Sequence, residues 1–383
     1  MINPRYAFAT AYLKAAESRL VTSEHLEGML RASNLPEALE LIQDTDIGSY
    51  LRRQTINKFD AFDASLWEYL QEHIEHLEGL RILPDEMHTV LQKHLVKYDV
   101  LNIKAALQGI AAHQKARMIP VGVICSRGLL DELSDAAEIE GIIEISRRCG
   151  LERYADILSR ESRVESRESG RAGDSRLQTP DSGLQMIGSQ LDNAYYQDYL
   201  ATAKSLTEGH LLTKSLGFII DLLNLQMVLR SVGKRQESRV KSQEPRVDSQ
   251  ESGKGGDSRL QTPDSRLQTL GGGYMLSGEI ISELLSLKLP DIPGRLEDTF
   301  YYQVGQDVLV SYEKTHSLTA IEEVIDKHKF QLLRDILMPR VMSSLLMPWY
   351  LILKEMELRN LRLVAKSLLD NLEGAKNLLV VNS

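Results

Sequence analysis

The sequence predicts an all-helical protein built from three related helical units. Three observations support this prediction: a composition rich in helix formers, apolar residues that recur at helical spacing, and one ten-residue pattern that occurs three times. Of the 383 residues, 43% are hydrophobic, 26% charged and only 6% aromatic. These fractions are typical of a soluble globular chain, and the abundant Leu, Ala, Glu and Arg all favour helices.

The repeated pattern consists of an acid, two residues, Asn, then Leu or Ile and a long polar residue. Its copies are YDVLNIKAAL (98–107), IDLLNLQMVL (220–229) and MELRNLRLVA (356–365). In a helix the acid and the Asn lie within about one turn, so a polar seam runs beside an apolar stripe. The seam residues are Asp99, Asn102, Lys104, Asp221, Asn224, Gln226, Glu357, Asn360 and Arg362. Three copies at near-regular spacing predict an internal repeat.

This polar seam has two interpretations. In the structural one, the acids bond a neighbouring helix or a basic residue and the Asn side chains bridge loop backbone, because buried polar groups are costly to leave unsatisfied. In the functional one, the same residues form an ion pathway or a binding ring. The structural interpretation is favoured, since no segment is predicted to lie in a membrane.

Local signals place the first helices. Asn3 and Pro4 predict the N-cap and first residue of a helix that continues to Leu20. Ser23 is the next predicted cap, and residues 34–37 have the form of a capping box.

Longer helices follow. A break is predicted at residues 46–48, and amphipathic helices at 55–80 and 85–112. Residues 118–123 are predicted to be a short extended or loop piece, with helices resuming near Leu129. Further capping boxes, at 135–138 and 319–322, predict two later helix starts.

Two segments depart from this pattern. Residues 160–185 and 234–270 are rich in Ser, Arg, Glu, Gln, Asp and Gly and contain no aromatic residue, and the sequence of 173–182 recurs at 256–265. Such composition buries too little apolar area to offset the entropy of ordering, so we expect two disordered insertions. An accidental insertion of repetitive coding sequence is favoured over a dedicated binding function.

Removing the insertions regularises the repeat. The three signature Asn residues are then each about 100 residues apart, as expected for units of comparable size. The predicted division is a first unit at 1–115, a second at 116–233 with an insert at 160–185, an insert at 234–270, and a third unit at 271–383.

Charge and cysteine content narrow the function. The net charge of −9 argues against binding to a nucleic-acid backbone or an anionic membrane surface. Two cysteines, Cys125 and Cys149, make no disulfide framework, which fits a reducing cytoplasm. The charge-free run 341–353 falls short of the ~20 residues that a spanning helix needs. No membrane span and no secretory signal is predicted, so any membrane role is indirect.

No motif predicts catalysis or a cofactor. The Gly-Lys pairs at 233–234 and 253–254 lack the flanking residues of a phosphate-binding loop, and residues 271–274 do not have the context of a dinucleotide site. No catalytic residue, cofactor or metal site is therefore predicted.

Histidines offer the best metal candidates, and each is favoured to be an ordinary surface residue. His73 and His76, three apart and beside Glu72, could share a helix face, but the sequence offers no second ligand cluster. His94 and His113 flank the first signature; they are either partner contacts or simple surface residues, and the second interpretation is favoured.

The ordered motifs resemble a known family. Residues 6–20 and 39–51, together with the three signature helices, are similar to the C subunit of prokaryotic V/A-type rotary ATPases, whose eukaryotic relative is the d subunit. The resemblance covers the chain outside the two insertions.

The resemblance implies a non-catalytic component of such a machine. A protein of this family is an all-helical funnel of three pseudo-threefold-related units, peripheral on the cytoplasmic face of the membrane. It joins the central stalk to the membrane rotor ring of proteolipid subunits and transmits torque between ATP chemistry and ion (proton) transport, including ATP synthesis. Two alternatives are a cytosolic helical-repeat scaffold with unrelated partners, and an enzyme with a metal site at His73 and His76.

Overall fold

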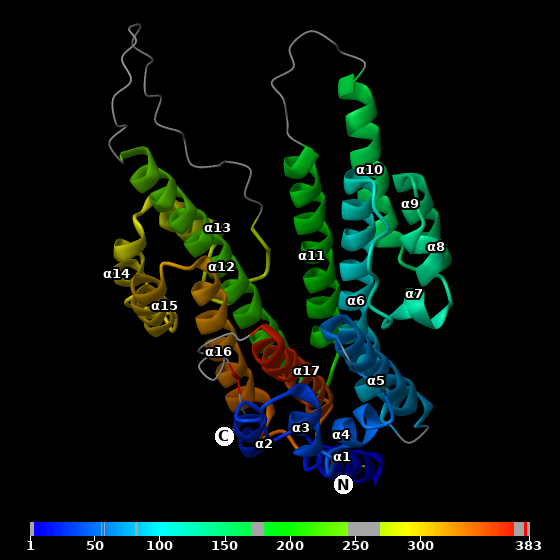
Figure 1. The fold of residues 1–383 in the computed structure, drawn as a ribbon. Helices are drawn as coiled ribbons and strands as arrows, with labels where there is room; N and C mark the ends of the chain where they lie inside the picture. The colour runs from blue at the N-terminus through cyan, green and yellow to red at the C-terminus, as the bar shows by residue number, and fades with distance from the viewer. Residues whose placement is uncertain are drawn as a thin grey trace, which may run out of the picture. The chain divides into compact units, whose positions relative to one another are not determined.

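The computed structural model describes residues 4–54, 56, 58–80, 83–169, 180–243, 269–370 and 379–380. Every regular element within these ranges is a helix (Figure 1). The predicted all-α fold class is confirmed.

The chain divides into two compact units. One unit combines Met1–Ser215 with Leu332–Ser383, and the other is Leu216–Gln331. Two helices, α12 (Gly209–Gln243) and α16 (Leu318–Leu337), contribute residues to both units. The division into three units remains a prediction.

The first unit contains most of the helices. They are α1 (Pro4–Glu17), α2 (Ser23–Met29), α3 (Leu35–Glu40), α4 (Asp46–Leu51), α5 (Phe59–Gly79), α6 (Asp85–Ala112), α7 (Val123–Ser126), α8 (Leu130–Ser134), α9 (Ile139–Arg148), α10 (Glu152–Ser169), α11 (Pro180–Lys204) and α17 (Leu346–Asp370).

Two signature helices organise this unit. Helix α6 packs against α11 and against the short helices α7, α8 and α9, while α10 packs against α9 and α11 (Figure 1). Helix α17 contacts α1, α2 and α3 from the start of the chain, as well as α5 and α6. Segments from the two ends of the chain therefore share one core.

The long helices were the most predictable elements. Helix α5 buries Leu66, Leu70, Ile74 and Leu77 at helical spacing, and each fully buried side chain of this kind contributes about 1.5–3 kcal/mol. Pro84 separates α5 from α6 because proline is tolerated only at a helix start. The predicted helix at 85–112 is confirmed, and the one predicted at 55–80 is present but begins at Phe59.

The second unit carries the middle signature copy. Besides its parts of α12 and α16, it contains α13 (Gly278–Ser286), the 3₁₀ turn η1 (Leu289–Asp291), α14 (Ile292–Arg295) and α15 (Tyr302–Thr315). Its core includes Ile281, Leu284, Ile292 and Val308, and α14 packs directly on α15.

Several predicted helix starts are wrong. Asn34 does cap α3, by accepting a hydrogen bond from the amide of Glu37, but Glu138 is itself the N-cap of α9 and Thr319 lies inside α16. The capping box that forms in the first unit is Thr22 with His25, which no Glu or Gln signals. A capping pattern is local, whereas the position of a helix start also depends on what its first turn packs against.

The predicted break at 46–48 is also wrong. Thr45 caps α4 by accepting a hydrogen bond from the amide of Gly48 at 3.0 Å, so residues 46–48 are the first turn of a helix. Gly48 is the reason for the error, since a glycine after an acid suggests a turn when no tertiary contacts are known.

The flanks of both insertions are helical. Helix α10 continues to Ser169, α11 begins at Pro180, and α12 continues to Gln243. The predicted boundaries 160–185 and 234–270 are therefore corrected at these flanks, because a helix that has started extends by one hydrogen bond per residue without needing a buried face. The central parts of both insertions lie outside the described residues.

Helix α12 also modifies the membrane prediction. By length and composition, Gly209–Gln236 could cross a membrane, although 67% of its most apolar window is buried inside the protein. A buried core helix has the same properties, so this observation is weak evidence for a span. The sequence reasoning considered only the shorter run at 341–353 and did not identify this stretch.

Candidate functional site

The candidate site is the set of three junctions at which the signature helices α6, α12 and α17 bind loop backbone. In each, the acid and the Asn three residues later are buried. Their side chains are at most 5% exposed: Asp99, Asn102, Asp221, Asn224, Glu357 and Asn360. Buried polar groups require partners, and the structure provides them.

Each signature Asn exchanges two hydrogen bonds with one loop residue. Asn102 Nδ2 donates to the carbonyl of Ile119 at 2.9 Å, and the Ile119 amide donates to Asn102 Oδ1 at 2.7 Å. Asn224 makes the same pair with Leu270, at 2.9 and 2.8 Å.

The third copy repeats this exchange. Asn360 pairs with Val380 at 2.6 and 3.1 Å, so an amide side chain replaces a missing backbone partner for one loop residue in every copy. A carboxylate could accept but not donate in this position, which gives a physical reason for Asn at all three.

The first two acids bind backbone amides at, or just before, the start of a short helix. Asp99 accepts from the amides of Val123 at 3.0 Å and Ile124 at 2.9 Å, at the beginning of α7. A carboxylate at a helix N-terminus satisfies amides that have no partner within the helix.

Asp221 occupies the same role before α13. It accepts from the amides of Tyr274 at 3.0 Å and Met275 at 2.7 Å, and more distantly from Leu276 at 3.3 Å. The Tyr301 hydroxyl donates to it at 2.6 Å, which ties the α15 end of this unit to the same carboxylate.

The third acid is a glutamate with different partners. Glu357 accepts from the Val21 amide at 2.8 Å, just before α2, and from the ammonium of Lys354 at 3.0 Å. Lys354 is fully buried and also donates to the Tyr69 hydroxyl at 2.7 Å. Val96 and Phe218 stand at the corresponding positions of the other copies, so the buried ion pair is particular to the third.

The length of the acidic side chain, Asp or Glu, depends on whether glycine or a larger residue precedes the amide that it binds. Gly122 precedes Val123, and a Cβ there would lie 2.6 Å from Asp99 Oδ1; Gly273 precedes Tyr274, and a Cβ there would lie 2.0 Å from Asp221 Oδ1. The short aspartate thus requires close approach of a glycine backbone. Glutamate is one methylene longer, and Leu20 precedes its amide.

Burial changes the titration of both aspartates. Burial raises the pKa of Asp99 to about 6, against the lowering effect of the Ile124 and Val123 amides. Burial also raises the pKa of Asp221, while the Tyr301 hydroxyl and the loop amides oppose that increase.

The long polar residue of the signature, two positions after the Asn, forms an ion pair with a neighbouring long helix in two of the three copies. Lys104 pairs with Asp192 of α11 at 2.8 Å. Arg362 pairs with Asp63 of α5 and lies over the Trp67 ring, 4.2 Å from its centroid. Gln226 lies on α12, where Arg230, one turn later, pairs with Glu322 of α16.

Sequence reasoning missed a second polar cluster in the first unit. His94, expected at the surface, is 6% exposed and pairs with Glu355 of α17 at 2.7 Å, and Lys97 and Tyr98 bind the same carboxylate. Burial opposes the charge on Glu355, but Lys97 and His94 hold its pKa below the usual range. The only available signal was that the three α6 residues share one helix face.

The histidine metal site is not assembled. The Tyr350 hydroxyl contacts His73 Nε2 at 2.7 Å, and His73 stacks on Tyr69, while His76 lies against the Tyr12 ring. Burial and the nearby Lys354 ammonium lower the pKa of His73 to about 3. Within the described part of the chain, no group of three or more His, Cys, Asp or Glu is placed to hold a metal.

These junctions define the class: an all-helical protein in which repeated acids and amides fasten loops to long helices. The chain belongs to the ATP synthase (C/AC39) subunit family, whose model matches residues 9–247. The resemblance inferred from the sequence is confirmed.

Relatives extend the match across the chain. The C subunit of the A-type ATP synthase of Methanocaldococcus jannaschii is 25% identical over 390 residues, covering 98% of this chain and 86% of the relative. The corresponding proteins of Methanothermobacter thermautotrophicus and Pyrococcus horikoshii are each 22% identical, covering 94% and 97% of this chain and 83% and 88% of the relatives.

The raised pKa of Asp99 predicts a pH-dependent stability difference between the wild type and Asp99→Asn. The folded pKa of about 6 exceeds the ordinary 3.8, so folding favours the protonated acid and the stability of the wild type falls as pH rises from 4 to 7. A difference of roughly two pKa units corresponds to about 3 kcal/mol.

Urea unfolding of both proteins at pH 4, 5, 6 and 7 measures this difference. Subtracting the variant removes the contribution of every other titrating group. A free-energy difference that stays constant across this range, or rises with pH, would contradict the burial argument.

Adding a methyl group beside the acid should destabilise the junction. At Gly122 an alanine would meet both a φ of +106° and the Asp99 carboxylate, whereas at Gly128, with a φ of +69°, nothing lies within 4 Å of an added Cβ. We expect Gly128→Ala to lower the free energy of unfolding by about 1–2 kcal/mol and Gly122→Ala by at least twice as much. Equal losses in chemical denaturation would show that the carboxylate contact contributes nothing.

The second insertion can be shortened only as far as Leu270, because the backbone of Leu270 binds Asn224. Replacing residues 244–268 with a short Gly-Ser linker keeps the backbone pair between Leu270 and Asn224, whereas deleting 234–270 removes it. We expect the first variant to keep the wild-type melting temperature and the second to lose several degrees, because Asn224 is then buried without partners and the contact of Arg235 with the Leu285 carbonyl is lost as well. Equal melting temperatures in differential scanning calorimetry would refute this.

Proposed function

We propose that this chain is a non-catalytic rotor subunit of a V/A-type rotary ATPase or ATP synthase, which couples the central stalk to the membrane ion-translocating ring. The observation that carries the proposal is family membership, joined to relatives named as the C subunits of A-type ATP synthases that cover 94–98% of the chain. In this role the chain contributes shape and stiffness, and the ATP chemistry takes place in other subunits.

The junctions supply the stiffness that this role requires. In each copy a buried Asn fixes the loop after a long helix, and a buried acid fixes backbone at or just before a short helix. Buried polar contacts of this kind favour one arrangement, because every alternative leaves a group unpaired. We therefore assign the nine signature residues a structural role in a rigid coupling and none in an ion pathway.

The proposed partners are the central-stalk subunits and the proteolipid rotor ring. The chain would be peripheral, on the cytoplasmic face of the membrane, and held there through the ring. Within this proposal the three signature copies are the cores of three related units that together form a socket for the stalk.

An affinity pull-down tests the assignment. A tagged chain expressed in its native host and purified from detergent extract should recover both central-stalk and ring subunits, identified by mass spectrometry. The same tag on an unrelated helical protein controls for non-specific capture. Recovery of neither partner would favour a cytosolic scaffold and overturn the proposal.

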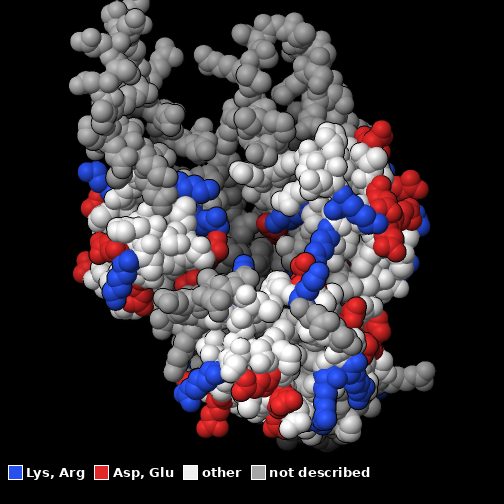
Figure 2. All heavy atoms as spheres, in the orientation of Figure 1, with Lys and Arg blue, Asp and Glu red and all other residues white. Residues whose placement is uncertain are grey.

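High salt should weaken the contact between this chain and the central stalk. The chain is acidic, and Figure 2 shows Asp and Glu gathered over the region where Figure 1 places α8 and α9. The exposed acids there are Asp131, Glu132, Asp135, Glu138, Glu140 and Glu144. We expect a wash at high ionic strength to release the stalk from the immobilised chain, because screening weakens contacts between exposed charges. Recovery that is unchanged by salt would exclude an electrostatic joint.

A further inference from the structure

The third signature differs from the others in where its acid finds a backbone partner. The amides bound by Asp99 lie 24 and 25 residues after it, and the first two bound by Asp221 lie 53 and 54 residues after it. The amide bound by Glu357 belongs to Val21, 336 residues earlier in the chain.

The order of the helices along the chain also sets the third signature apart. Helix α6 is followed by the short helices α7–α9, by α10 and by the long α11, and α12 is followed by α13–α15 and the long α16. Helix α17 is the last helix described, and the elements it needs come from the other end of the chain. It contacts the short helices α2 and α3 and the long α5, and Arg362 reaches Asp63 of α5 as Lys104 reaches Asp192 of α11.

We infer that the third unit is split between the two ends of the chain and is closed non-covalently. It consists of α17 together with α2–α5, and residues 4–51 (α1–α4), here named the closing segment, dock on α17 as a separable piece. The first two junctions are continuous along the backbone. This inference does not depend on the proposed function.

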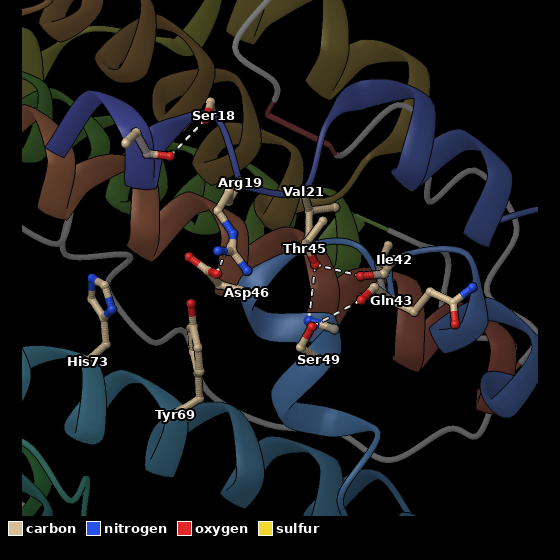
Figure 3. Close-up of polar contacts among 12 residues, drawn as sticks. Ser18, Arg19, Val21, Ile42, Gln43, Thr45, Asp46, Ser49, Tyr69 and His73 are labelled. Carbon is tan, nitrogen blue, oxygen red and sulfur yellow. Dashed lines mark hydrogen bonds and ion pairs between the residues drawn. The ribbon is translucent and has the colours of Figure 1, made fainter. Parts of the chain in front are cut away.

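The closing segment is tied together internally. The Arg19 guanidinium pairs with Asp46 at 2.7 Å, and the Asp46 amide donates to the Arg19 carbonyl at 3.3 Å, which joins the end of α1 to the start of α4. Figure 3 shows this pair beside the Thr45 cap and Val21. The segment's apolar residues are buried in the core that it shares with α17: Leu26, Met29, Ala38, Ile42 and Ile47.

Few specific polar contacts hold this segment in place. The Val21 amide donates to Glu357, and the Thr10 hydroxyl donates to the Val341 carbonyl. At the start of α6, the Tyr6 hydroxyl donates to Glu86 at 3.1 Å and Arg5 lies 3.9 Å from the exposed Asp85. The covalent link to α5 passes through residues 52–58, of which Arg52, Arg53 and Gln54 are exposed. The segment can therefore leave α17 while α5 keeps its Arg362 and Lys354 contacts.

Cleaving the link in the folded full-length protein tests the inference. A protease recognition sequence is inserted between Arg53 and Gln54, and the native protein is cut and run on size-exclusion columns at decreasing concentrations. We expect the two pieces to co-elute at micromolar concentration. Glu357→Gln should weaken their association about tenfold, because a neutral amide oxygen accepts the Val21 N–H less strongly than a carboxylate and leaves the buried Lys354 without its anion.

Asp99→Asn is the matched control. It makes the same chemical change at a junction whose loop is continuous with its helix, so the affinity of the cut pieces should change less than twofold. Immediate separation of the wild-type pieces would overturn the inference, as would equal weakening by both variants.

Hydrogen–deuterium exchange on the uncut chain gives an independent measurement if a cut variant folds poorly. Glu357→Gln should accelerate exchange throughout α2–α4 and leave α7–α9 unchanged, and Asp99→Asn should do the reverse. Acceleration confined to the Val21 amide, or spread evenly over the chain, would show that the closing segment does not open as a unit and would refute the proposal.

Discussion

A carboxylate buried on the face of a helix must find N–H donors, and this constraint determines much of the structure. Asp99, Asp221 and Glu357 each face the interior from the middle of a long helix, where their own backbone has no donor to spare. The donors are backbone amides beside a short helix: the first residues of α7 for Asp99, the loop residues just before α13 for Asp221, and the residue before the N-cap of α2 for Glu357. At each junction the buried carboxylate and the backbone amides satisfy one another, and their hydrogen bonds fix the loop in place.

The third copy shows how this constraint is met when the local chain changes. Aspartate works where glycine lets the backbone come close, as at Gly122 and Gly273. Where Leu20 precedes the amide, glutamate supplies the extra length, and its longer side chain also meets Lys354. The third copy thus differs from the others in its acid, in the residue before the bound amide and in its ion pair. All three differences are expected if the carboxylate must reach a loop amide that lies farther from the helix.

Sequence reasoning predicted the repeated elements and failed on their partners. The signature pattern and the long helices α5 and α6 follow from periodicity, which is local and repeated. The start of α9 at Ile139 and the burial of His94 depend on contacts with distant segments, which no short pattern encodes. The regular spacing of the signature predicts units that are continuous along the chain. It therefore gives no indication that Glu357 binds Val21, which lies near the other end of the chain.

The position of Lys354 follows from this discontinuity. At the first two junctions the backbone itself links the acid's helix to the loop, so the hydrogen bonds need only orient the loop. At the third they must also hold the closing segment, and one amide bond to a charged acceptor contributes only about 1.5–3 kcal/mol. A buried lysine, hydrogen-bonded to the Tyr69 hydroxyl, also binds the Glu357 carboxylate and orients it toward the Val21 amide, which reinforces that bond. Val96 and Phe218 replace it in the continuous copies, where the backbone already holds the loop and this reinforcement is not needed.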